Sequence, residues 1–196
     1  MMDDVPPDFP DVQVSPRQVA ILADQMACWF TTSRSDGQGL ALEGGRPMQA
    51  TAAAAVRDFL RSKQGRLARA IWWEVPDGTV PAAACDALAE HVYRPRPRGE
   101  RPYTWLTRSF AEEPTSPLTV VTEAQRLLRG PGSRTLYKLW HDLIRFEPGL
   151  LILVGDGLVP GLFRGEAERS LKPYMTTVRW ELLSGDWGRT YPLPKA

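Results

Sequence analysis

Two acidic residues stand at places where side chains could do chemistry. Asp77 follows the apolar segment 70–75, Asp156 follows the apolar segment 150–154, and each is followed directly by glycine. In open α/β sheets, ligands bind beyond the carboxyl ends of the parallel strands. If both segments are parallel strands, the two carboxylates lie at one edge of the sheet, where they could bind a metal ion or activate water. The simpler interpretation is a pair of turns, because Asp-Gly is favoured turn chemistry.

A second candidate pair lies on one predicted helix. Arg134 and His141 are seven residues apart, so they lie two turns along the same helix face. This spacing resembles a loose form of the Arg–His motif of HEPN ribonucleases, helical domains in which a dimer brings two such pairs together. The resemblance covers this helix only, and it implies metal-free RNA cleavage with Arg134 and His141 as catalytic residues. The alternative is an ordinary surface Arg and His.

Basic residues concentrate in the middle of the chain. The window from Arg57 to Lys138 holds 14 Lys or Arg and 9 Asp or Glu, a net charge of +5, whereas the whole chain carries +1. Guanidinium groups bind phosphates in a bidentate manner, so the Arg-Pro-rich loop 94–99 could contact nucleic acid. The candidate contact residues are Arg94, Arg96, Arg98 and Arg101. A solvated charged loop is the simpler interpretation.

Tryptophan is abundant, with seven residues in 196. Trp and Arg are enriched at binding hot spots, so Trp105 and Trp187 are further candidates for contacts with a partner. Trp72 and Trp73 are adjacent, and on a strand their side chains face opposite sides of the sheet. Core packing explains most of the tryptophans.

Several familiar site patterns are absent from the sequence. Two Cys and two His without ligand spacing do not form a structural zinc site, and we expect neither a metal ion nor a cofactor. The glycine-rich turn Gly155–Gly157 lacks the Gly-Lys-Ser/Thr of a Walker A loop, and it does not open a helix as Gly-x-Gly-x-x-Gly does. There is no Gly-x-Ser-x-Gly elbow and no His-Glu-x-x-His sequence.

Hydrophobic periodicity predicts the secondary structure. We expect a loop over 31–47, with a short strand around Leu40 and Leu42. The segment 150–154 is apolar without alternation, which is typical of a strand covered on both faces. The remaining pattern predicts helices over 15–30, 48–63, 81–93, 122–129 and 133–146, and strands over 67–75, 103–110, 117–121, 176–183 and 187–193. The fold class is therefore α/β or α+β, with a mixed sheet of about four to six strands and helices packed on it.

Composition and length limit the organisation of the chain. With 196 residues and 43% hydrophobic residues, we expect one globular α/β domain over 15–196, preceded by a weakly ordered acidic arm over 1–14. The N-terminus lacks the pattern of a signal peptide, and the longest apolar run is too short to span a bilayer. A cytoplasmic protein without a membrane partner is expected. Abundant Arg, Ala and Pro indicate a GC-rich bacterial genome.

These observations favour a non-enzymatic subunit or adaptor. It would dock on a protein or nucleoprotein partner through Trp- and Arg-rich surfaces, so a protein partner is expected, and nucleic acid is the alternative through the local basic patch. The first competing hypothesis is a nucleic-acid- or nucleotide-acting enzyme that uses Arg134 and His141 or the strand-end aspartates. The second is a small-ligand sensor at the Gly155–Gly157 turn.

Overall fold

The described part of the chain forms one six-stranded sheet. The structure, a computed structural model, describes residues 2–3, 6–32, 38–62, 68–91, 97–101, 104–105, 108, 116–128, 130, 132–146, 150–162, 171 and 175–179. The strands are β1 (Met2–Asp3), β2 (Gln38–Glu43), β3 (Ala68–Glu74), β4 (Ser116–Thr122), β5 (Leu150–Gly155) and β6 (Met175–Arg179). Their order across the sheet is β1-β3-β4-β5-β2-β6; β2 to β6 are parallel, and β1 is antiparallel to β3. The predicted mixed sheet and the α/β class are confirmed.

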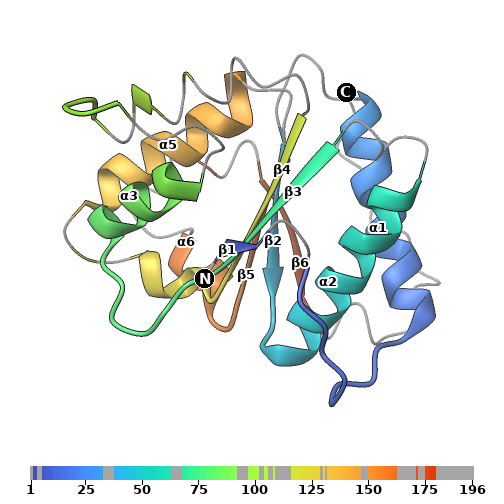
Figure 1. Ribbon diagram of the computed structural model, residues 1–196. Coiled ribbons are helices and arrows are strands. Elements are labelled where there is room, and N and C mark those ends of the chain that lie inside the picture. Colours follow the sequence, from blue (N-terminus) through green and yellow to red (C-terminus); the bar gives the residue numbers. More distant parts are fainter. Residues whose placement is uncertain are drawn as a thin grey trace.

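Helices cover both faces of the sheet (Figure 1). On one face lie α1 (Pro16–Thr32) and α2 (Arg46–Arg61), and on the other lie α3 (Pro81–His91), the 3₁₀ helix η2 (Ala124–Leu127), α5 (Ser133–Phe146) and α6 (Leu158–Leu162). Each face has its own apolar cluster, as expected for a parallel sheet buried between two helical layers. In the part of the chain that the structure describes, no helix combines the length and apolar character needed to cross a membrane.

The strand β5 lies in the interior of the sheet, as its apolar run predicts. It pairs with β4 on one side and with β2 on the other. Leu151 and Leu153 join the cluster under α3 and α5, while Ile152 and Val154 join the cluster under α1 and α2. The neighbouring pair Trp72 and Trp73 on β3 divides in the same way, each side chain buried on its own face.

The short strand predicted around Leu40 and Leu42 is confirmed, because residues 38–43 form β2, a strand between β5 and β6. The packing around β2 is tight, since a Cβ added at Gly39 would be 3.1 Å from both Ile144 and Met175. The predicted strand 103–110 is wrong at its described residues: Thr104, Trp105 and Arg108 are helical, and the Trp105 N–H donates to the Arg101 carbonyl at 3.0 Å, as in a helical turn. The predicted return strand 187–193 lies outside the described residues.

The acidic N-terminal arm is attached to α2 and to the edge of the sheet. One nitrogen of the Arg46 guanidinium lies 2.9 and 2.7 Å from the two carboxylate oxygens of Asp11, and Arg57 pairs with Asp8. The hydrogen bond from Arg46 lowers the pKa of Asp11. Phe9 packs against the α1–α2 cluster, with the guanidinium of Arg46 5.9 Å from its ring centre. The arm thus engages the only basic residue at the start of α2.

Because Ile152 is fully buried between two packed layers, Ile152→Ala should cost about 2–5 kcal/mol of unfolding free energy, measured by urea denaturation. The matched control is Val80→Ala at a valine that is 45% exposed, which should cost less than about 0.5 kcal/mol. A loss at Ile152 no larger than that at Val80 would show that β5 does not lie in the core.

Candidate functional site at the carboxyl edge of the sheet

The connections of the sheet mark one edge as the place for a ligand. After β2 the chain crosses to α2 on one face, whereas after β3, β4 and β5 it enters α3, η2 and α6 on the other face. The carboxyl end of β2, beside β5, is therefore a topological switch point, where open α/β sheets bind ligands. The turns after these four strands form this edge, and they contain most of the polar contacts described below.

The turn from β2 into α2 is short and has few free N–H groups. Only Gly44 and Gly45 separate the strand from the helix. The N–H groups of Met48 and Gln49 both donate to the Gly45 carbonyl, at 3.0 and 3.1 Å, and Pro47 has no N–H. A helix N-terminus binds anions through its free N–H groups, and here most of the first turn is already bonded or lacks a donor.

The turn after β5 lies against this same turn. The Gly44 N–H donates to the Gly155 carbonyl at 3.1 Å, and the Gly157 N–H donates to the Glu43 carboxylate at 2.7 Å. The Asp156 carboxylate lies beside Gly45, since a Cβ added to that glycine would be 3.2 Å from Asp156 Oδ2. Two carboxylates, those of Glu43 and Asp156, therefore flank the entrance to α2.

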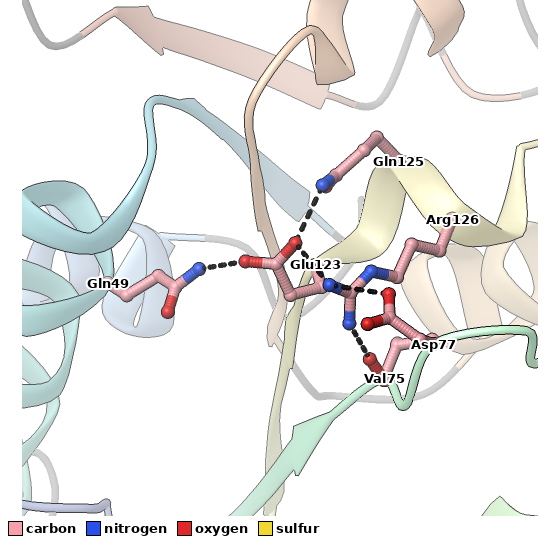
Figure 2. Close-up of polar contacts among 6 residues, drawn as sticks. All are labelled: Gln49, Val75, Asp77, Glu123, Gln125 and Arg126. Atoms are coloured by element: carbon pink, nitrogen blue, oxygen red, sulfur yellow. Dashed lines mark hydrogen bonds and ion pairs between the residues drawn. The ribbon is translucent and has the colours of Figure 1, made fainter.

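A third carboxylate, that of Glu123, lies at the centre of the edge (Figure 2). Glu123 follows β4 directly and has φ 56° and ψ 30°. This is the left-handed conformation, which is energetically unfavourable for any residue other than glycine. Gln49 Nε2 donates to Glu123 Oε1 at 2.6 Å, and Gln125 Nε2 donates to Glu123 Oε2 at 2.8 Å. Glu123 thereby connects α2, β4 and η2.

Arg126 extends this network to the end of β3. Its Nη2 lies 3.4 Å from Glu123 Oε2 and 2.9 Å from Asp77 Oδ1, and its Nη1 donates to the Val75 carbonyl at 2.5 Å. The Arg126 side chain is 30% exposed and that of Asp77 is 91% exposed, so the Asp77 pair is a surface contact of small energetic value. We call Gln49, Glu123, Gln125 and Arg126 the carboxylate network.

The network fits only because residue 155 is glycine. A Cβ at Gly155 would lie 1.9 Å from Gln125 Oε1 and 3.3 Å from the Gln125 backbone nitrogen. The Oε1 atom is buried and has no hydrogen-bond partner among the described contacts. Gln125 is therefore packed against the end of β5 while its amide nitrogen holds Glu123.

The two aspartates singled out in the sequence lie at this edge as expected, but they do not share a site. Asp77 contacts Arg126, while Asp156 lies beside Gly45, and β4 separates the strands that they follow. Within the described ranges, no group of three or more His, Cys, Asp or Glu side chains is arranged to hold a metal ion.

The other candidates lie elsewhere. Arg134 is exposed near the start of α5 and His141 is half-buried on the same helix, which packs on the parallel sheet. Trp105 is only 4% exposed and belongs to the core, so the structure contradicts its assignment as a surface contact. Arg98 and Arg101 are exposed. Arg94, Arg96 and Trp187 lie outside the described residues.

Comparison with known proteins identifies the fold and no family. No protein-family model matches the sequence, and no curated protein matches it. Among solved structures, the Orc1 protein of Aeropyrum pernix in complex with DNA matches with TM-score 0.64 and 19% identity, over 86% of this chain and 46% of that one. A Walker-type ATPase of Pyrococcus abyssi matches with TM-score 0.53 and 14% identity, over 88% of this chain and 55% of that one. The chain thus spans about half the length of these proteins. The likeness shows that the α/β fold of this chain is shared with parts of these two proteins.

The residues at the edge do not fit a nucleotide bound as in P-loop proteins. Such a site uses Gly-x-x-x-x-Gly-Lys-Ser/Thr between strand and helix, with the Lys on the phosphates and the Ser/Thr on Mg²⁺. Here the corresponding turn reads Glu43-Gly44-Gly45-Arg46-Pro47, without Lys or Ser/Thr. Arg46, the one cation there, is paired with Asp11. The acidic side chains nearby would repel phosphate.

The carboxylate network was not predicted, because the Asp-Gly pattern points to Asp77 and Asp156 and does not include Glu123. The available signal was a charged residue directly after an apolar strand, Thr119-Val120-Val121-Thr122 before Glu123. Nothing local in the sequence links Glu123 to Gln49, which lies 74 positions away.

Because Gln125 fills the space beside Gly155, Gly155→Ala should displace Gln125 from Glu123 and cost about 1–3 kcal/mol, measured by urea denaturation. The double variant Gly155→Ala, Gln125→Ala removes the clash, so it should be more stable than Gly155→Ala alone. If the double variant were less stable than the single one, the steric explanation would be wrong.

Proposed function

We propose that this chain is a non-enzymatic subunit or adaptor with an ATPase-type fold, which docks on a protein or nucleoprotein partner. One observation supports the proposal most directly: the turn between β2 and α2 lacks the Lys and the Ser or Thr that hold phosphate and Mg²⁺ in such folds. A fold can keep its architecture while its site changes, so the likeness to ATPases does not imply ATP hydrolysis.

Two of the carboxylates at the carboxyl edge are hydrogen-bonded within the chain. Glu123 accepts hydrogen bonds from Gln49 and Gln125, and Glu43 accepts one from the turn after β5. Hydrogen-bonded carboxylates are costly to expose and re-pair, so this arrangement supports a structural role at the edge. Docking would then use other surfaces.

The exposed arginines of the loop before β4 are the candidates for docking. Arg98 and Arg101 are exposed, while Arg108 is paired with Glu100 at 2.8 Å. Because α3 runs from the carboxyl edge back to the amino edge, this loop lies at the end of the sheet opposite the carboxylate network. A partner bound there would leave the network untouched. The similar Orc1 protein was solved in complex with DNA, which supports including nucleoprotein among the partners.

If the carboxyl edge does not hold nucleotide, ATP with Mg²⁺ should not stabilise the protein. At about 1 mM, a nucleotide with a dissociation constant of about 10 µM would add about 2.7 kcal/mol to the unfolding free energy, a rise in Tm of roughly 5–10 °C. We expect a rise of less than about 1 °C by differential scanning fluorimetry. A Walker-type ATPase titrated in parallel is the positive control. A saturable rise in Tm together with phosphate release would refute the proposal.

The purified chain should bind nucleic acid negligibly near physiological salt if its primary partner is a protein. Duplex and single-stranded DNA and RNA should be titrated by fluorescence anisotropy over a salt series, since contacts to phosphates give a steep salt dependence. Should binding occur, Arg98→Ala with Arg101→Ala should reduce the slope of log K against log salt by about two. The control Arg61→Ala removes an exposed arginine from α2 and should leave the slope unchanged relative to the wild type.

Binding that the double variant weakens and the control does not would make a nucleoprotein partner the preferred form of the proposal. Metal-free RNA cleavage abolished by His141→Ala, with unchanged melting, would instead overturn the non-enzymatic proposal and support the Arg134–His141 hypothesis.

A further inference from the structure

The start of α2 has a negative charge beside it that comes from the protein itself. Gln49 is the fourth residue of α2, and its side chain donates to the Glu123 carboxylate at 2.6 Å. The N-terminal end of a helix carries partial positive charge, so an anion beside its first turn is stabilised. In phosphate-binding folds the anion at this place is supplied by a ligand.

The backbone conformation of Glu123 indicates that the surrounding residues hold its carboxylate against Gln49. A left-handed conformation at a residue other than glycine is unfavourable, and it persists only where the surrounding structure stabilises it. The surroundings supply Gln49, Gln125 and Arg126, with contacts of 2.6, 2.8 and 3.4 Å to the carboxylate oxygens. The strained backbone is thus coupled to a carboxylate that three side chains hold in place (Figure 2).

We propose that the Glu123 carboxylate is a built-in anion, which takes the place of a bound phosphate at the start of α2 and fastens this helix to the end of β4. The inference rests on the proposed function, because it assumes that no nucleotide occupies this edge. The inference goes beyond the proposed function because it assigns the role of a bound phosphate to the side chain of Glu123. The position of α2 relative to the sheet would then not depend on a bound ligand.

A carboxylate can replace a phosphate here because the two groups have similar hydrogen-bonding properties. A carboxylate, like a phosphate, presents oxygen acceptors and negative charge, and Gln49 supplies a donor that reaches across from the helix. Arg126 partly balances the charge, and its own guanidinium is fixed by the Val75 carbonyl. Removing the Glu123 side chain should therefore leave a site with unpaired donors, open to a small external anion.

The test is anion rescue. Glu123→Ala should lower the Tm by about 3–8 °C, because the donors of Gln49 and Gln125 lose a charged acceptor. Sodium formate or acetate should restore part of that loss in a saturable manner, with sodium chloride at equal ionic strength as the reference. Glu123→Gly, which also relieves the left-handed backbone, should show the same rescue, and it is the variant to use if Glu123→Ala fails to fold. The matched control combines Gln49→Leu with Glu123→Ala or Glu123→Gly, so that the principal donor is absent.

Rescue of the Glu123 variants, weaker in the Gln49→Leu background and absent in the wild type, is the expected result. No loss of Tm on removing Glu123, or a loss that formate and acetate do not restore, would overturn the inference. Neither of these outcomes requires nucleotide binding by the wild type, so they are distinguishable from failure of the proposed function, which the ATP titration reports separately.

Discussion

The carboxylate of Glu123 must be hydrogen-bonded, and much of the carboxyl edge is arranged to satisfy it. An ionised group that is only 23% exposed costs several kcal/mol if its donors are missing. Its donors come from three residues: Gln49 on α2, and Gln125 and Arg126 on η2. Gln125 in turn needs the space beside Gly155, so the end of β5 is fixed by the same requirement. One carboxylate thus constrains a helix, two strand ends and a glycine that lie far apart in the sequence.

The residues that build the sheet differ from those that would bind phosphate at its carboxyl edge. The sheet order and the two helical layers depend on apolar burial, which is spread over many residues on both faces. Phosphate binding depends on a few residues in one turn, and there Gly44-Gly45-Arg46-Pro47 stands instead of a phosphate-binding loop. The two sets of residues are independent, so the fold can persist after the turn has changed. In this chain, the side chain of Gln49 on α2 is hydrogen-bonded to Glu123.

The sequence predicts those parts whose signal is local and apolar. The run Leu150–Val154 identifies an interior strand because no polar residue interrupts it, and the helical spacing of Leu136, Leu139 and Trp140 identifies α5. For β2 the sequence predicts only a short strand around Leu40 and Leu42, because Gly39 and Ala41 weaken its apolar pattern. Close packing against Ile144 and Met175 leaves little room for a side chain at Gly39. The carboxylate network is not predicted for a different reason. The hydrogen bond between Gln49 and Glu123 depends on the order of the strands in the sheet, and the residue type at neither position indicates that order.

The two ends of the sheet differ in whether their charged side chains are already paired within the chain. At the carboxyl edge, Glu43 and Glu123 are bonded to groups of the same chain, and an approaching phosphate would have to displace those bonds against the negative charge of Asp156. At the amino edge, the described part of the loop before β4 presents Arg98 and Arg101 to solvent. A partner gains more from exposed guanidinium groups, whose bonds to water are exchanged, than from acids that are already paired. The proposed docking at the amino edge would therefore leave the hydrogen bonds of Glu43 and Glu123 in place.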